Sequence, residues 1–177
     1  MRAALREKHD DVECAAHIDA TQFRRAFSNL ASGVVVITFD MGRLVYGFTA
    51  TSLTPVSLDP PLALFCVKQD SACGKSLEQN MRVGISILGV HQADIARTFA
   101  KPTPEHGYGG LPFFAGVPVV GGANVTLLAQ ITALHPAGDH MIYVCAVECA
   151  ATTKNSDPLI YYDKDYQSIH RRLDVST

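Results

Sequence analysis

The sequence lacks any apolar run of the roughly 18 residues that a membrane-spanning helix needs. Its N-terminal segment, residues 1–19, also lacks the apolar stretch of a secretory signal. No block of lysine or arginine occurs and the formal net charge is −2, which argues against a nucleic-acid partner bound through its phosphates. These absences predict a cytoplasmic protein that binds neither membranes nor nucleic acid.

The motifs of several enzyme classes are missing too. The chain has no GxSxG, HExxH or GxxxxGK[ST] pattern, so nothing supports a hydrolase of the first two types or a P-loop nucleotide site. Its five cysteines form no CxxC pair, and no Cys/His spacing is typical of zinc, so no metal site is predicted. The odd count favours free thiols in a reducing compartment.

The residues that are present suit one compact domain. The 177 residues are 47% apolar and 18% charged, ordinary values for a globular protein with its own core. We expect a flexible N-terminal arm at 1–18, a single domain at 19–170 and a C-terminal tail at 171–177.

The domain begins with the pattern of an amphipathic helix. Asp19 precedes Gln22 by three residues, the spacing of a capping box, and Gly33 is the expected stop. Apolar residues recur at helical spacing between them, at Phe23, Ala26, Phe27 and Leu30.

Most of the remaining chain is rich in β-branched and aromatic residues. The expected elements, in chain order, are a hairpin of strands at 34–39 and 44–50, a break at the prolines of SLDPP, a strand at 62–68, a short helix over 71–80 with Ser71 near its start, a strand at 82–88, an amphipathic helix over 92–100, a Gly/Pro-rich surface segment over 101–122, an antiparallel pair at 123–135 and 140–153, and a short strand with an aromatic tail at 157–169.

Hairpin-linked strands with few helices indicate a mainly β fold, a closed or nearly closed antiparallel barrel. The βα alternation of a doubly wound sheet is missing. Both faces of residues 141–149 are apolar, so the outer face of that strand should be covered by the chain's own helices or by a second subunit. We favour a homodimer.

Two polar segments are candidates for ligand binding. GFTATSLTPVS, residues 47–57, carries five hydroxyl residues at a strand end, which suits a phosphate or the edge of a flat heterocycle, although a plain Ser/Thr turn has the same composition. SACGKS, residues 71–76, places helix amides and Lys75 near one another, although a simple helix N-cap is commoner.

One histidine stands apart from the other six by its position. His140 follows Gly138 and Asp139 at the start of a long β-rich segment, where a turn has no need of an imidazole. Local physics favours an incidental turn residue, and the remaining histidines are expected at the surface.

Taken together, GFTATSLTPVSLDPPLALFCV, GISIL, ARTFA, PAGDHMIYVCAVE and PLIYYDKDY resemble the short-chain flavin reductases, the reductase components of two-component flavin monooxygenases. The resemblance runs from about residue 23 to about residue 166 in unbroken order. It implies a split β-barrel homodimer of the FMN-binding, Greek-key type. Its activity would be that of an NAD(P)H:flavin oxidoreductase, which takes hydride from NADH or NADPH, passes it to FMN or FAD, and supplies a partner monooxygenase with reduced flavin.

The resemblance also implies roles for particular residues. Thr49, Ala50, Thr51 and Ser52 would line the isoalloxazine and ribityl chain, Ser57 and Ser71 would lie on the phosphate side, Arg97 and Phe99 would border the flavin, and His140 and Tyr166 would lie at the nicotinamide face, with His140 as the catalytic residue.

The chain departs from the family at two positions. Cys73 stands where the family often has Ser or Thr, and Thr98 where it often has Arg, and either change is expected to weaken the grip on phosphate. Two alternative functions remain open: a flavin-binding electron-transfer module, and a flavoenzyme that reduces another cofactor directly without supplying diffusible flavin.

Overall fold

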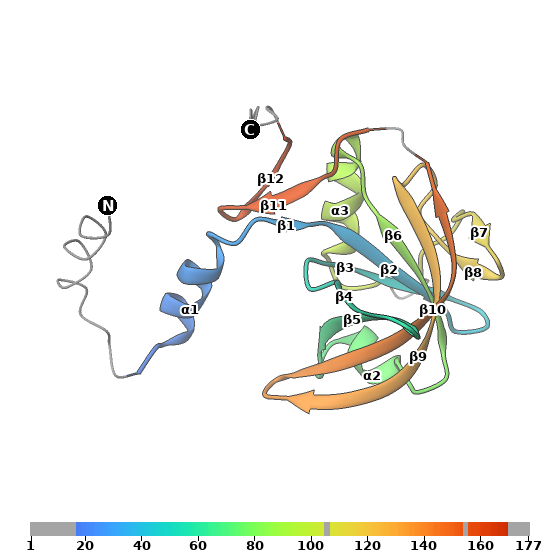
Figure 1. Ribbon diagram of the computed structural model, residues 1–177, viewed down its shortest axis with the longest axis horizontal. Helices are drawn as coiled ribbons and strands as arrows, with labels where there is room; N and C mark the ends of the chain where they lie inside the picture. Colours follow the sequence, from blue (N-terminus) through green and yellow to red (C-terminus); the bar gives the residue numbers. More distant parts are fainter. Residues whose placement is uncertain (1–16, 105–106, 154–155, 170–177) are drawn as a thin grey trace.

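The computed structural model describes residues 17–104, 107–153 and 156–169, so most of the expected arm and the expected tail lie outside it. The described chain is mainly β, as predicted. Its largest sheet is antiparallel throughout and has the strand order β3-β2-β6-β9-β10-β5-β4. In Figure 1 this sheet curls into a barrel, with α1 extending away from it.

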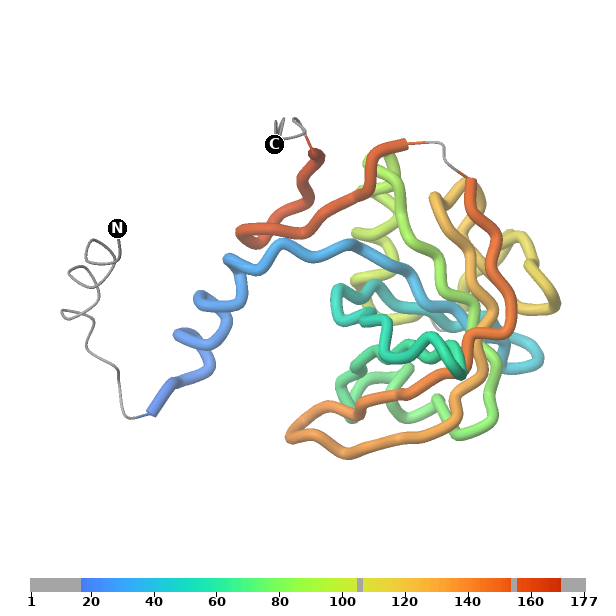
Figure 2. The backbone as a smooth tube through the Cα atoms, in the orientation of Figure 1, coloured from blue at the N-terminus to red at the C-terminus, as the bar shows by residue number. Residues whose placement is uncertain are grey.

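The bounds of the main strands follow the β-rich segments closely. They are β2 Val35–Asp40, β3 Val45–Ala50, β4 Thr54–Leu58, β5 Pro61–Lys68, β6 Arg82–Ile87, β9 Val125–Ala137 and β10 His140–Thr152. Shorter strands complete the fold: β1 Ser32–Gly33, β7 Phe113–Phe114, β8 Val117–Pro118, β11 Ile160–Tyr162 and β12 Asp165–Gln167. Figure 2 follows the same path as a tube, with the β9–β10 hairpin reaching out from the barrel.

The core explains why the sheet closes. Alternate residues of β5, including Phe65 and Val67, are buried, and Phe65 stacks on its register partner Tyr143 of β10 with ring centroids 5.2 Å apart. These side chains belong to one cluster with Ile37 of β2 and Ile131 of β9. Because strands far apart in the sheet order share one apolar interior, the sheet must curve around it.

The helices are α1 Ala20–Phe27, α2 Ala72–Ser76, the 3-10 turn η1 Val90–Gln92, and α3 Ala93–Phe99. α2 and α3 pack mainly against β2, β3 and β5, which leaves the outer face of β10 half-exposed at Ile142 and Val144. The chain's own helices therefore do not cover that face within the described residues.

The predicted start of the first helix is confirmed, whereas its predicted end is wrong. Asp19 and Gln22 form both bonds of the capping box. The helix stops at Phe27, where Ser28 Oγ donates to the Arg25 carbonyl at 2.8 Å, and Gly33 instead belongs to β1, paired with Ile160. Gly33 was expected to end the helix. It lies instead in a short strand, because β1 pairs with β11 from the C-terminal part of the chain.

β4 was not predicted, because its composition is that of a turn. Thr54–Leu58 pairs antiparallel with β5 at the edge of the sheet, and the SLDPP break proves to be the turn between these two strands. An edge strand tolerates Pro55 because one side of it needs no ladder donor.

Candidate functional site

The structure has a cleft of about 510 Å³ between β3, the end of β5, α2 and the segment that follows α3. His140, the first residue of β10, stands at its rim. The volume lies within the range of small-molecule sites. The lining combines apolar and polar side chains: Gly47, Phe48, Thr49, Cys66, Val67, Lys68, Ser71, Ala72, Cys73, Phe99, Ala100, Lys101, Pro102, Thr103 and His140.

Phe99 forms an aromatic wall of this cleft because Gly47 leaves room for it. A Cβ on Gly47 would lie 2.7 Å from Cε1 of Phe99, closer than real carbon contacts allow. On its other side Phe99 stacks on Tyr108, with ring centroids 4.1 Å apart. Phe99 is thus fixed between β3 and Tyr108, and it is only 4% exposed.

The Gly47 carbonyl anchors two polar side chains at the base of the cleft. It accepts from Thr103 Oγ1 at 3.2 Å and from Cys73 Sγ at 3.7 Å. Burial raises the pKa of the Cys73 thiol, so the group stays neutral at ordinary pH. The Cys73 thiol is thus directed at the chain's own backbone.

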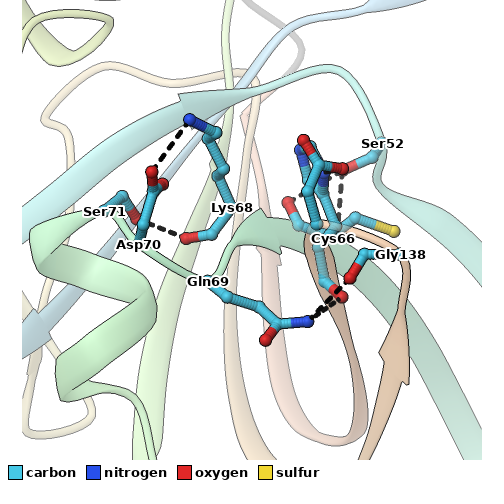
Figure 3. A network of polar contacts seen from close by, with 9 residues as sticks. Ser52, Cys66, Lys68, Gln69, Asp70, Ser71 and Gly138 are labelled. Carbon is cyan, nitrogen blue, oxygen red and sulfur yellow. Dashed lines mark hydrogen bonds and ion pairs between the residues drawn. The ribbon is translucent and has the colours of Figure 1, made fainter.

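Thr49 and Ser71 both line the cleft, and hydrogen bonds hold both of their hydroxyls. Thr49 Oγ1 donates to the Ala96 carbonyl at 2.7 Å, which joins β3 to α3. Ser71 caps α2: its hydroxyl accepts from Gly74 N at 3.0 Å and donates to the Lys68 carbonyl at 2.7 Å, a bond drawn in Figure 3. Both hydroxyls therefore have fixed positions before any ligand binds.

Two ammonium groups border the cleft. Lys68 Nζ lies 3.0 Å from Asp70 Oδ2 at the surface (Figure 3), whereas Lys101 has no ion pair among the described residues. A cation without an ion pair and a Ser hydroxyl in the lining of one cleft suit a phosphate better than an uncharged ligand.

His140 and Asp139 form a hydrogen-bonded pair at the rim. His140 Nδ1 lies 2.7 Å from Asp139 Oδ1, and this bond lowers the pKa of the Asp139 carboxyl. Because an ionised carboxylate only accepts, Nδ1 carries a proton, which leaves Nε2 as the acceptor of the neutral ring. The turn is tight: Gly138 has φ +62°, a conformation that favours glycine.

The structure brings four of the ten residues singled out from the sequence into this cleft: Thr49, Ser71, Phe99 and His140. Ala50 points into the core, since neighbours in a strand face opposite sides. Thr51 is exposed at a bend. Ser52 Oγ instead accepts from Cys66 N at 3.0 Å and fixes the β3–β4 connection to β5 (Figure 3).

Arg97 and Tyr166 meet each other rather than the cleft. The Arg97 guanidinium lies 5.3 Å from the Tyr166 ring centroid and 2.9 Å from Asp94 Oδ1. Neither residue belongs to the lining of the cleft.

Ser57 borders a second, apolar groove of about 470 Å³ at the other end of β5. Its lining is Gly33, Val35, Leu53, Pro55, Ser57, Pro61, Leu62, Ala63, Ile87, Leu127 and Val147.

Several residues of the cleft gave no signal in the sequence. Lys101 and Thr103 lie in the Gly/Pro-rich segment after α3, which was expected to be a surface excursion. Gly47 begins the candidate segment 47–57, but its close contact with Phe99 was not predicted.

The cleft suits a flat heterocycle that carries phosphate. Phe48, Phe99 and Val67 supply apolar surface for the rings, Thr49 and Thr103 supply hydroxyls for polar edges, and Lys101 with Ser71 supplies a phosphate side. No group of three or more His, Cys, Asp or Glu residues is placed to hold a metal within the described residues. No helix in the described part of the chain is long and apolar enough to cross a membrane.

Comparison with known proteins gives consistent results. The flavin reductase like domain family matches residues 27–170. The chain is 34% identical over 161 residues to "FMN reductase (NADH) RutF 1" of Methylorubrum extorquens, covering 89% of this chain and 80% of that protein. It is 29% identical to "Flavin-dependent monooxygenase, reductase subunit HsaB" of Mycobacterium tuberculosis, covering 88% and 85%.

Among solved structures, the NADH:FAD oxidoreductase SgcE6 of Streptomyces globisporus, in complex with NAD and FAD fragments, superposes with a TM-score of 0.82. The two chains are 28% identical, and the match covers 92% of this chain and all of the other (100%).

Proposed function

Because the chain belongs to the flavin reductase like family, we propose that it transfers a hydride from NADH or NADPH to FMN or FAD and supplies the reduced flavin to a partner monooxygenase. The observation that carries this proposal is the cleft, which combines an aromatic wall, a phosphate side and His140 within the matched residues. Related proteins are an NADH-dependent FMN reductase and the reductase subunit of a flavin-dependent monooxygenase.

The residues of the cleft would bind and orient rather than react. A bound flavin supplies the hydride acceptor, and the reaction needs no side-chain nucleophile. Phe99 and Phe48 would hold the ring system, while Lys101 and Ser71 would hold its phosphate. His140 Nε2 would accept a hydrogen bond from the nicotinamide carboxamide and so align the two reactants, the main source of rate in such a transfer.

Steady-state turnover over the four combinations of NADH or NADPH with FMN or FAD tests the proposal. Absorbance at about 340 nm should fall faster when flavin is added, since the nicotinamide is oxidised only through it. Absence of flavin-dependent oxidation with either nucleotide would refute it. Flavin that stays bound through gel filtration without turnover would favour the electron-transfer module.

The role of His140 has its own test. His140→Gln keeps a polar side chain but removes the ring that Asp139 orients, so hydride transfer should slow by roughly tenfold or more, because small misplacements of reactants are costly. Unchanged turnover would make His140 an incidental turn residue.

We also propose that the chain is a homodimer, and that α1 of one copy docks in the apolar groove of the other. α1 has no buried residue: Phe23 and Phe27 are 51% and 55% exposed, and their rings lie 4.5 Å apart on one face. The lining of the groove is mainly apolar, as are the exposed rings of α1. Gly33, which belongs to this lining, follows the C-terminal end of α1 by six residues. In Figure 1 the helix stands away from its own barrel.

The exposed rings of α1 would supply part of the free energy that a dimer needs. Burying the exposed half of one Phe side chain stabilises by about 1 kcal/mol, so four rings across a two-fold interface contribute about 4 kcal/mol before the groove's own surface is counted. Phe27→Ser should therefore shift the protein toward monomer in light scattering after size exclusion. Met41→Ser, which changes an apolar residue that is 44% exposed at the β2–β3 turn, is the matched control. Equal dimer fractions in both variants would refute the docking.

A further inference from the structure

Gln69, which is neither in the cleft nor among the residues singled out from the sequence, bonds every carbonyl of the Gly138–His140 turn. Its backbone N–H donates to the Asp139 carbonyl at 3.0 Å. Its side-chain Nε2 donates to the Gly138 carbonyl at 3.2 Å and to the His140 carbonyl at 2.8 Å. Figure 3 shows the amide of Gln69 directed at Gly138. We propose that Gln69 is a positioning residue that fixes this turn, and through it His140, at the rim of the cleft.

The proposal rests on the proposed function, since it assigns Gln69 a part in the work of His140. The turn needs an external support because it lies at the tip of the long β9–β10 hairpin, where residues 135–139 are exposed. The ladder between β10 and β5 ends with His140 opposite Lys68. Gln69 directly follows the last residue of β5, so it is the first group beyond the ladder that can hold the turn.

The chemistry of the amide fits three converging carbonyls. A glutamine NH2 has two hydrogens, and here each meets one carbonyl oxygen, while the backbone N–H meets the third. An ionised carboxylate at this position would face the same oxygens with no hydrogen to donate. The position therefore requires a donor side chain, not merely a polar one.

The support reaches the imidazole through Asp139. The Asp139 carboxylate holds His140 Nδ1 at 2.7 Å, and both residues project from backbone that Gln69 bonds. If the turn pivoted, the carboxylate and the ring would leave their positions together, because nothing else among the described residues bonds the ring. Gln69 thus fixes the turn beside His140, whose backbone the ladder pairs with Lys68 and Ala137, while Asp139 determines how its ring is turned.

Gln69→Met tests the proposal, since it keeps the length of the side chain and removes both donors. Gln79→Met is the matched control: Gln79 Nε2 donates to the Thr132 carbonyl at 2.8 Å, also between exposed groups, and outside the lining of the cleft. Hydride transfer at saturating substrate should fall about tenfold in Gln69→Met, because positioning at this scale controls such rates. KM for flavin should stay within about twofold, and Gln79→Met should match the parent protein.

Two further variants separate positioning from simple stability. In Gln69→Met combined with His140→Gln, turnover should be no lower than in His140→Gln alone, because Gln69 acts only through His140. Gln69→Glu should lose activity as Gln69→Met does at about pH 8, because a carboxylate facing the same carbonyl oxygens cannot donate.

We call the three hydrogen bonds from Gln69 to the Gly138–His140 turn the clamp. The clamp is overturned if Gln69→Met turns over like the parent, or if adding Gln69→Met to His140→Gln lowers turnover by the same factor as in the parent. Either result leaves the proposed function intact, because the parent's turnover is measured alongside. If instead the parent shows no flavin-dependent oxidation, the proposed function fails and ring nitrogen-15 NMR decides the clamp. The clamp predicts one Nδ1–H tautomer of His140 in the parent and in Gln79→Met, and a mixture of tautomers in Gln69→Met; unchanged ring signals in Gln69→Met refute it.

Discussion

Gly47→Ala should push Phe99 into the cleft and so couple a loss of stability to a loss of flavin affinity. The new methyl would lie 2.7 and 2.9 Å from two ring carbons of Phe99, and 2.9 Å from the Thr38 methyl. Gly47 is buried in β3, and Phe99 is confined by Tyr108 on its other face, so the clash can be relieved only toward the cleft that Phe99 borders.

The magnitude follows from two opposed effects. Overpacking of a dense core costs about 1–3 kcal/mol. Replacing glycine within a strand returns about 0.5–1 kcal/mol, because alanine has less backbone freedom to lose on folding. The net loss therefore lies between about 0 and 2.5 kcal/mol, centred near 1 kcal/mol, and each kcal/mol lowers the melting temperature of a domain of this size by about 2–4 °C.

Thermal unfolding and flavin titration, read by quenching of flavin fluorescence, measure the two effects. Gly109→Ala is the control, since a Cβ at Gly109 meets nothing within 4 Å. Phe99→Leu replaces the aromatic ring by a shorter side chain. In that background Gly47→Ala should lower the free energy of unfolding markedly less than it does in the parent. An equal cost in both backgrounds would refute the contact with Phe99, and unchanged flavin affinity would refute its place in the cleft.

Two other predictions concern groups outside the cleft. Burial raises the pKa of the Cys145 thiol to about 12 from 9.0, so above pH 9 the unfolded chain gives up a proton that the folded chain keeps, and stability falls as the pH rises. Urea unfolding should give a lower free energy of unfolding at about pH 10 than at about pH 8, and Cys145→Ala should reduce this difference. The same difference in the variant and the parent would contradict the prediction. Asp19→Ala removes a cap whose Oδ1 accepts from two backbone amides at 2.7 Å, which should cost α1 about 1 kcal/mol. Amide exchange in residues 22–27 should rise while the barrel keeps its melting temperature, and a matching loss in the barrel would show that α1 is part of it.

Much of the fold could be predicted from the sequence because the interactions that determine those parts lie close together along the chain. The bonds of Asp19 and Gln22 lie within one turn of chain, and the strands that were predicted carry their own β-branched pattern. β4 was missed for the opposite reason, since Thr54–Leu58 becomes a strand only because β5 lies beside it.

The candidate site was harder to predict because it is assembled from distant segments. Thr49 and His140 carried a recognisable pattern, but nothing in the sequence joins Lys101 and Thr103 to them. Helix geometry also separates Arg97 from Phe99: residues two apart on a helix project about 200° apart, so only one of the two can face the cleft. Phe99 does.

β5 borders both the apolar groove and the cleft, and this shared strand allows the two sites to be coupled in free energy. Pro61, Leu62 and Ala63 border the apolar groove, while Cys66, Val67 and Lys68 border the cleft. One strand, about 20 Å from Leu62 to Lys68, therefore belongs to both sites. If occupation of the groove by a second copy changes flavin affinity by some factor, flavin must change the affinity between the two copies by the same factor. Dilution and flavin titration then become two measurements of one coupling free energy.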